Sequence, residues 1–466
     1  MKKVFDYSFG KFERILLALF CLILFLATLT RPFVDHDVLI YSIVGRAIFE
    51  RGLLPYEFAF DHKPLFTYYI YGLISVIFPI WLPIHQLLTA CVILLTATLT
   101  RFLAGTEKLK LHFILMLFIS FPFIRFSGNT EIYLSLFSLL SFTILFKAKR
   151  FWQLVCSGAM AAIAVNINYL AVFVIVPSSL YLVASSARGI NDFIIRSVGC
   201  ILGFISGCLI IFMPMLLKDP ALVSHYFTLQ KQFLQGYREH SYLPPWRFTL
   251  ILGSLCILML TSMQCAPEKK RLRTGIVITI LSGLAAAASS GKFYLHYGYM
   301  LVPPVVVLFT LSTARIKWVA MIMVVATVTV PIGIQSVRKA GPPYEWARNY
   351  NFSQFNDIKA KVGEAKVLSI RATHIPVYYA ELMPTQPFIW DDHAKLVFGA
   401  AEDDYYNSFL TMQQIFVLAP ATLCTESKPS QLPEVCFSLN LNYEILSTYG
   451  ENFWGEISLY KRKLAG

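Results

Sequence analysis

The sequence predicts a polytopic α-helical membrane protein with a small α/β region at its C-terminal end, and three observations lead to this fold class. Of the 466 residues, 56% are hydrophobic and 14% are charged, whereas a soluble domain carries about 25% charged residues. The mean hydropathy is +0.60. The apolar residues form long blocks, such as 15–29, 198–217 and 318–334, which approach the ~20 residues that a helix needs to cross ~30 Å of hydrocarbon. Because backbone groups in hydrocarbon must bond within their own segment, these blocks are predicted to be helices.

The basic residues account for the net charge of +13 and predict the topology. They occur in short clusters between the apolar blocks, which is typical of cytoplasmic loops and does not indicate a nucleic-acid-binding surface. The first apolar block follows one such cluster, and no small-residue cleavage site precedes Arg31. We therefore interpret this block as a retained transmembrane helix and not as a signal peptide. The other clusters lie at residues 101–110, 147–150, 188–196, 269–273 and 315–317.

If every basic cluster lies on the inner side, an even number of crossings must separate successive clusters. Three apolar blocks lie between residues 14 and 101, so one of them should not cross. The block at 65–80 is short and rich in tyrosine, and we expect it to lie in the outer interface. The expected crossings, about eleven in all, are residues 15–30, 85–102, 111–124, 131–146, 152–166, 169–186, 196–217, 247–263, 274–288, 298–313 and 317–336.

The predicted crossings divide the chain into two domains. Residues 1–336 are expected to form a transmembrane domain with a cytoplasmic N-terminus and a long periplasmic loop at 31–84. A second outward loop is expected at 218–246. The more polar tail, 337–466, is expected to form a soluble domain in the periplasm.

The tail alternates short apolar runs, 367–370 and 415–418, with Pro and Asn/Asp turns. This pattern predicts a small α/β or mixed domain. Cys424 and Cys436 both lie in the tail, and an oxidising compartment would favour a disulfide between them. The other seven cysteines lie singly in or beside apolar blocks, without the spacing of a metal site.

The first outward loop holds the main candidates for chemistry. Asp35 and Asp37 follow the first crossing directly. The residues after them predict a helix in the membrane interface that ends at Gly52, because apolar side chains recur at helical spacing; they are Ile40, Ile43, Val44, Ala47 and Ile48. A second polar motif runs from Asp61 through Lys63 to Pro64 and opens the non-crossing block.

Acidic residues and a lysine at the membrane surface would suit chemistry on a lipid-linked phosphate. A carboxylate can take a proton from an acceptor hydroxyl, and a lysine or histidine can neutralise a departing phosphate. The alternative is that these polar side chains are only solvated and that Asp35 caps the following helix.

Two further outward segments carry polar residues at a membrane boundary. The first runs from Arg125 to Glu131, where Asn129 or Thr130 could simply cap the helix that Glu131 opens. The second is led by Lys292 and also contains His296 and Tyr297. Aromatic residues at such a boundary often only anchor a helix, but Lys292 and His296 would add cationic groups on the same face as the aspartates.

The first loop resembles that of the GT-C membrane glycosyltransferases, nearest to bacterial relatives of protein O-mannosyltransferases and of the aminoarabinose transferase of lipid A. The resemblance rests on Asp37 with Tyr41 four positions on, then Gly52, Pro55, Tyr56 and the run from Asp61 to Pro64. The segments Ser127–Glu131 and Lys292–Pro304 are more loosely similar to later segments of that family. The resemblance covers roughly the transmembrane domain.

The resemblance implies a GT-C fold and transfer of a sugar, usually with inversion, from a polyprenyl-phosphate (undecaprenyl-phosphate) donor at the periplasmic face of the bacterial inner membrane. The acceptor would be an envelope glycan, a lipid such as lipopolysaccharide, or a protein. It implies that Asp37 is the catalytic base, with Asp35 as the alternative, and that Glu131 is a second acid. The donor phosphate would meet Lys63, with His296 and Arg125 as further candidates; the supporting residues would be Tyr41, His62, Lys292 and Tyr297.

The resemblance leaves the need for a cofactor open. A divalent metal ion, Mg²⁺ or Mn²⁺, could bind at Asp35, Asp37 and Glu131, although some members of the family work without one. Neither a Walker-type nor a GxGxxG glycine pattern occurs in the sequence, which fits a donor that is already lipid-linked.

Two other functional classes remain as alternatives. A lipid or polysaccharide transporter would need ionisable residues within its membrane helices, whereas nearly all charges here lie in predicted loops. A sugar polymerase or ligase of the O-antigen type usually centres on an arginine-rich outer loop, but the loop at 218–246 offers only Arg238, with Arg247 at its edge.

Overall fold

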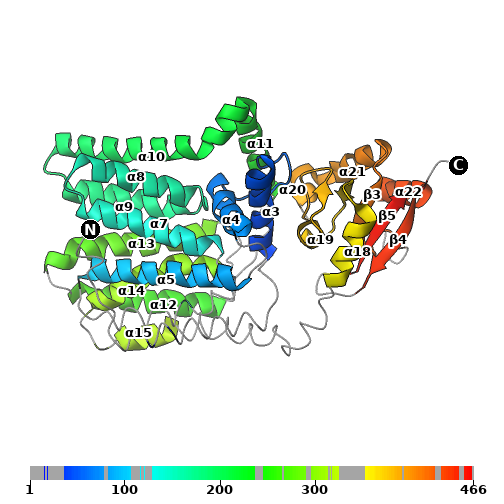
Figure 1. The fold of residues 1–466 in the computed structure, drawn as a ribbon. Helices are drawn as coiled ribbons and strands as arrows, with labels where there is room; N and C mark the ends of the chain where they lie inside the picture. The colour runs from blue at the N-terminus through cyan, green and yellow to red at the C-terminus, as the bar shows by residue number, and fades with distance from the viewer. Residues whose placement is uncertain are drawn as a thin grey trace.

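The computed structural model of the protein describes most of the chain, which folds into a helical region and a mixed α/β region. The residues described are 15, 18, 36–77, 82–105, 116, 120, 129–236, 245–264, 267–289, 295–312, 315, 317–324, 352–390, 393–425, 432–450 and 456–463. Figure 1 shows a bundle of long helices, a layer of shorter helices at one end of it, and a mixed α/β region beyond that layer.

The bundle is made of helices that run side by side (Figure 1). They are α5 (Leu82–Ala104), α7 (Thr130–Lys147), α8 (Phe151–Val165), α9 (Ala171–Ser186), α10 (Ile190–Lys218), α12 (Pro245–Thr261), α13 (Lys270–Ser289), α14 (Val302–Leu311) and α15 (Lys317–Val324), with a 3₁₀ segment η3 (Leu295–Leu301) before α14. Four helical segments are long and apolar enough to cross a membrane: Leu87–Ala104, Thr130–Lys147, Ile190–Lys218 and Pro267–Ala288. Nearly all of the crossings expected at 15–30 and 111–124, and most of 317–336, lie outside the described residues.

Several of the predicted basic clusters meet at one end of the bundle. The Lys269 ammonium donates to the carbonyl oxygen of Ala104, 3.2 Å away. The Lys147 ammonium lies 5.5 Å from the ring centroid of Phe102, and Arg271 lies over Phe146 at 5.0 Å. The basic ends of α5, α7 and α13 are therefore gathered at one end of the bundle.

Helices α8 and α10 approach backbone to backbone through glycines. A methyl group added to Gly203 would lie 1.9 Å from the carbonyl oxygen of Val155, and one added to Gly158 would lie 2.0 Å from that of Cys200. Gly199, Gly203 and Gly207 are four residues apart on α10, so they form one small-residue face. This spacing allows close packing of membrane helices.

The segment expected to form the first outward loop contains the two short helices that its sequence predicts. Helix α3 (His36–Arg51) ends at Gly52, whose φ of 64° is left-handed, as is usual for a helix-terminating glycine. Helix α4 (Leu65–Ile77) has 13 residues and is therefore about 20 Å long, too short to cross a bilayer upright. The two helices cross where Gly45 meets Gly72.

The sequence predicts only a loop after α10. This prediction is incomplete, because the segment contains helix α11 (Pro220–Gly236). Tyr226, Gln230 and Phe233 are buried on one face of this helix. Tyr226 packs against Tyr56 with ring centroids 5.3 Å apart, and Phe233 packs against Phe60 at 5.5 Å. Helix α11 thus covers the turn between α3 and α4.

The C-terminal region forms a five-stranded mixed sheet with the order β2-β1-β3-β5-β4. The strands are β1 (Lys366–Ser369), β2 (Met383–Pro384), β3 (Phe416–Pro420), β4 (Tyr443–Tyr449) and β5 (Ile457–Arg462). Strand β1 pairs in parallel with β2 and β3, and β5 pairs antiparallel with β3 and β4. The helices of this region are α18 (Phe352–Val362), α19 (Ile375–Tyr379), α20 (His393–Phe398), α21 (Glu402–Thr411) and α22 (Pro433–Asn442).

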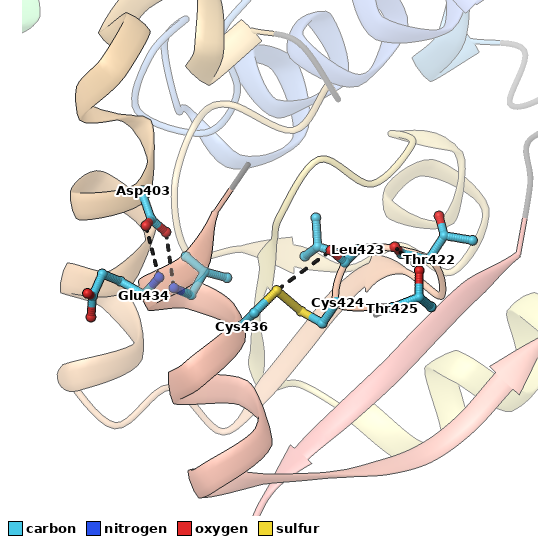
Figure 2. Close-up of a disulfide and its surroundings, with 8 residues drawn as sticks. Asp403, Thr422, Leu423, Cys424, Thr425, Glu434 and Cys436 are labelled. Atoms are coloured by element: carbon cyan, nitrogen blue, oxygen red, sulfur yellow. Dashed lines mark hydrogen bonds between the residues drawn. A yellow bond between two sulfur atoms is a disulfide. The ribbon is translucent and has the colours of Figure 1, made fainter. Parts of the chain in front are cut away.

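The two apolar runs that the sequence singles out are therefore the neighbouring strands β1 and β3, which confirms a mixed α/β architecture for the tail. The boundary expected between residues 336 and 337 lies outside the described residues. The expected disulfide between Cys424 and Cys436 is present (Figure 2). Beside it, the Asp403 carboxylate accepts hydrogen bonds from the backbone N–H groups of Glu434 and Val435 and so caps α22.

Candidate active site

The structure brings Asp37 next to the segment that ends in Glu131. Asp37 lies in the first turn of α3, and Asn129 is the N-cap of α7. The Asn129 side-chain oxygen accepts a hydrogen bond of 2.7 Å from the backbone N–H of Thr130. Its side-chain amide donates to Oδ2 of Asp37 at 3.3 Å. One residue thus caps α7 and also orients the predicted base.

Glu131 is buried in the first turn of α7, with 1% of its surface exposed. The side-chain amide of Asn168, in the turn between α8 and α9, donates to Oε1 of Glu131 at 3.0 Å. The helix N-terminus favours a negative charge at this position. The Glu131 carboxylate is therefore held in place by Asn168. Glu131 also lies in the first turn of a helix capped by Asn129, as the interpretation of this segment as a helix start expects.

Tyr41 is a buried residue of α3 close to Lys63. Its buried ring packs edge-on against Tyr71, with centroids 5.1 Å apart, and the Lys63 ammonium lies 5.9 Å from the Tyr41 ring centroid. Burial and nearby carboxylates raise the pKa of Tyr41 well above its ordinary value, so the phenol keeps its proton. These carboxylates are Asp37, Asp61 and Glu131.

The backbone of Lys63 is fixed by buried polar side chains. Its N–H donates to Oδ2 of Asp61 at 3.2 Å, and its carbonyl oxygen accepts from the Tyr68 hydroxyl at 3.0 Å. Gln230 of α11 donates to the same carbonyl oxygen at 3.4 Å and to the hydroxyl of Tyr56 at 2.9 Å. Lys63 is 6% exposed, so its side chain lies inside the protein and not on an open surface.

Asp61 is buried and accepts a hydrogen bond from the backbone N–H of Lys63. Burial acts to raise the pKa of the Asp61 carboxyl, but the charge and the hydrogen bond of the adjacent His62 act against it, and with the other neighbours they hold this pKa well below its usual range. His393 and Lys63 contribute further positive charge. His393 belongs to α20 of the C-terminal region, so this region contributes to the surroundings of the predicted phosphate-binding lysine.

The remaining predicted residues are described only in part. Asp35, Arg125 and Lys292 lie outside the described residues, as does the side chain of His296. Tyr297 is buried in η3, which packs against α7. Because Asp35 is not among the described residues, the metal site expected at Asp35, Asp37 and Glu131 stays a prediction.

Sequence reasoning missed Asn168, Gln230 and His393 as parts of this site. Asn168 lies in a turn that the sequence marks by its two asparagines, Asn166 and Asn168, between apolar blocks. Gln230 is the polar member of the buried face of α11. No local pattern marks His393, whose ring contacts Phe60 from 333 residues away in the sequence.

Comparison with known proteins identifies the fold. No family model matches the sequence, and no curated protein matches it. The structure is similar to that of ArnT from Cupriavidus metallidurans bound to undecaprenyl phosphate, with a TM-score of 0.62 and 13% identity over 96% of this chain and 97% of that chain. The chain has the GT-C fold. ArnT in the apo state gives a TM-score of 0.59 at 12% identity, with the same coverage of both chains.

A second GT-C protein, the arabinofuranosyltransferase AftD from Mycobacteria, is similar with a TM-score of 0.50 and 11% identity. The match covers 98% of this chain and 42% of AftD. The GT-C resemblance inferred from the first loop is thus confirmed at the level of the fold. Because the likeness to ArnT spans nearly all of both chains, the shared GT-C fold extends past the membrane helices into the C-terminal region.

Proposed function

We propose that the protein is a membrane glycosyltransferase that moves a sugar from a polyprenyl-phosphate donor to an envelope acceptor. The observation that carries this proposal is the arrangement around Tyr41. Asn129, the N-cap of the helix that carries Glu131 in its first turn, donates to Asp37 at 3.3 Å. The Lys63 ammonium lies 5.9 Å from the ring centroid of Tyr41, one turn after Asp37 on the same helix. Acidic groups for an acceptor and a cation for a phosphate are therefore grouped near the first turns of α3.

In the proposed reaction, the acceptor hydroxyl oxygen attacks the anomeric carbon of the donor sugar. The bond from that carbon to the phosphate oxygen breaks, and the hydroxyl proton passes to Asp37. This single displacement inverts the anomeric configuration. Asn129 orients the Asp37 carboxylate through its 3.3 Å hydrogen bond, which supports the role of Asp37 as base.

The leaving polyprenyl phosphate carries a negative charge that must be offset in the transition state. Lys63 is suited to this task because the backbone on both sides of its side chain is held by Tyr68 and Asp61. A polyprenyl-phosphate donor is supported by the fold, since ArnT, which has the same fold, is seen bound to undecaprenyl phosphate. Glu131, held by Asn168, would orient the acceptor. If Mg²⁺ or Mn²⁺ binds at Asp35, Asp37 and Glu131, it would add positive charge beside these acids.

We place the active site on the periplasmic side of the bacterial inner membrane. The disulfide between Cys424 and Cys436 supports an oxidising environment for the C-terminal region. The basic residues of α5, α7 and α13 lie at one end of the bundle, and α3, α4 and the mixed sheet lie at the other (Figure 1). This charge distribution is the one that the positive-inside rule requires.

A transporter is less well supported by the part of the bundle that the structure describes. In its four long apolar segments, the charged residues lie near the segment ends, as Glu131 and Lys147 do in α7. A transport pathway through the membrane would call for ionisable groups deeper within these helices.

The test is sugar transfer by the purified protein in nanodiscs, supplied with a panel of polyprenyl-phosphate sugars and crude envelope acceptors. Transfer by the wild-type protein that is lost in Asp37→Asn would establish the activity and identify the donor. If well-folded protein transfers no sugar from any donor, the proposal fails and the transporter and ligase alternatives gain weight.

A further inference from the structure

A cavity of about 150 Å³ lies between the second half of helix α3 and helix α19 of the C-terminal region. The two helices contact each other where the layer of shorter helices meets the α/β region (Figure 1). One water molecule needs about a tenth of this volume, and an apolar cavity of the same volume can hold a six-membered ring. Arg46 in the cavity wall lies nine residues beyond Asp37 on α3, or about 14 Å along the helix. The cavity is therefore separate from the proposed catalytic base.

The cavity combines buried apolar side chains with four charged residues. Phe58, Val377 and Tyr378 line it and are buried. The charged residues of the lining are two arginines and two glutamates: Arg46, Glu50, Arg51 and Glu381. An apolar lining with a few polar groups that fix orientation is typical of a small-molecule site. The lining therefore has the composition of a binding site for a polar ligand.

The two arginines of the cavity are held in place by contacts within the protein. Nε of Arg46 donates to Oε1 of Glu50 at 3.0 Å, and its guanidinium carbon lies 5.6 Å from the ring centroid of Tyr378. The guanidinium carbon of Arg51 lies 5.1 Å from the ring centroid of Phe58. Because side chains that are already ordered lose less entropy when a ligand binds, this arrangement favours binding.

Glu381 has a φ of 53°, in the left-handed region that residues other than glycine and asparagine rarely adopt. It follows α19 at the position where glycine usually ends a helix, and the N–H of Leu382 donates there to the carbonyl oxygen of Val377 at 3.0 Å. Lys359 forms an ion pair with Glu381, but both side chains are about half exposed, and such pairs add little to stability. Folding alone would therefore favour glycine at this position, so the carboxylate has another role.

The charges of the lining nearly balance one another. The hydrogen bond from Lys359 is the main cause that lowers the pKa of the Glu381 carboxyl, and the charges of Arg46 and Arg51 also lower it, so both arginines act on this carboxylate. A phosphate group would be attracted by the arginines but repelled by Glu50 and Glu381. A neutral sugar hydroxyl can donate to a carboxylate and accept from a guanidinium at the same time. The lining therefore suits a neutral polyhydroxyl ligand better than an anion.

We propose that this cavity is a subsite for a neutral sugar unit of the acceptor, remote from the hydroxyl that reacts. The assignment of this sugar to the acceptor rests on the proposed function. It implies that the acceptor is a glycan of more than one sugar unit. Binding of a remote part of a substrate helps to position its reacting group, so the subsite would hold the glycan while its end reaches Asp37.

The experiment is saccharide binding by the purified full-length chain in nanodiscs, measured by titration with saturation-transfer NMR. The probes are neutral di- and trisaccharides of glucose, galactose, mannose and N-acetylglucosamine, with glucose 1-phosphate and phosphoethanolamine as charged comparisons. We expect at least one neutral saccharide to bind in the millimolar range or more tightly, and the charged probes to bind more weakly. Because no donor is present, this measurement does not depend on sugar transfer.

The deciding variant is Glu381→Gly, because glycine adopts the left-handed conformation without strain. Its matched control is Gln413→Gly, which replaces another exposed residue with a left-handed φ, 67°, outside the cavity lining. Both variants should keep or raise the unfolding temperature. We expect Glu381→Gly to weaken saccharide binding by at least ~10-fold, the loss that one charged hydrogen bond accounts for, and Gln413→Gly to leave it unchanged.

Three results would overturn the subsite: no neutral saccharide binds to the wild-type protein at millimolar concentration, only a charged probe binds, or Glu381→Gly binds as tightly as wild type. An equal loss in Gln413→Gly would overturn it as well, because the loss would then not come from the cavity. Failure of the proposed function has a different signature, since saccharides would bind and depend on Glu381 while no donor supports transfer. If both hold, Glu381→Gly should raise the KM for long acceptors and leave that for a monosaccharide acceptor unchanged.

Discussion

Gly45 of α3 and Gly72 of α4 touch backbone to backbone, and a methyl group added to Gly45 would lie 2.4 Å from the Cα atom of Gly72. Helix α3 carries Asp37 and Tyr41, whereas Lys63 lies just before α4. This crossing therefore sets the separation between the proposed base and the proposed phosphate-binding lysine. A larger residue at either glycine would have to push two backbones apart, because no flexible side chain is present to move aside.

We accordingly expect Gly72→Ala to lower both stability and transfer activity. Overpacking of this kind costs about 1–3 kcal/mol, and the separation of α3 from α4 should slow transfer as well. Thermal unfolding in detergent measures the first effect, and the transfer assay measures the second. Gly253→Ala is the matched control, because nothing lies within 4 Å of a methyl group added there. Equal unfolding temperatures for the two variants would show that the crossing is not tightly packed.

Asp37→Asn tests the proposed base without removing its shape. The amide cannot take a proton from the acceptor, so we expect transfer to fall by about 10²–10⁴-fold. The unfolding temperature should stay near that of the wild type, because Asn129 can still donate to the remaining side-chain oxygen. Asp35→Asn is the companion variant and should retain activity. Full activity in Asp37→Asn with loss in Asp35→Asn would assign the base to Asp35.

Lys63→Ala tests the cation expected to meet the donor phosphate. Loss of a charged hydrogen bond of about 1.5–3 kcal/mol should raise the KM for the donor by roughly 10- to 100-fold. The KM for the acceptor should change much less. Lys231→Ala is a suitable control because Lys231 is exposed on α11. Equal losses toward donor and acceptor would indicate that Lys63 is only structural.

The local patterns of the sequence predict the helix that carries Asp37 and the helix that follows Lys63. Apolar spacing and Gly52 predict α3, and the next short block predicts a separate helix at α4, whose place relative to the membrane stays a prediction. Alternation of apolar runs and turns in the tail predicts β1 and β3. These successes share one cause: hydrophobic periodicity and helix-ending residues act over a few positions, so they can be read without knowledge of distant contacts.

The contacts that complete the site depend on distant parts of the chain and could not be predicted in this way. The amide of Asn168 reaches Glu131, and His393 reaches the loop at Phe60. Helix α11 is not predicted because Gln230 interrupts its apolar face. The burial of Gln230 depends on the distant carbonyl oxygens of Asp61 and Lys63, which accept its hydrogen bonds.

The disulfide between Cys424 and Cys436 allows a test of both stability and location. It closes a loop with a sequence separation of 12, and such a cross-link stabilises a folded region by about 2–3 kcal/mol. We expect the double variant Cys424→Ser with Cys436→Ser to lower the unfolding temperature of the C-terminal region, whereas Cys256→Ser, which replaces an exposed free cysteine, should not. In native membranes, Cys424 and Cys436 should react with a maleimide only after reduction, because the periplasm is oxidising. Reaction without reduction would place the C-terminal region on the cytoplasmic side and contradict the proposed topology.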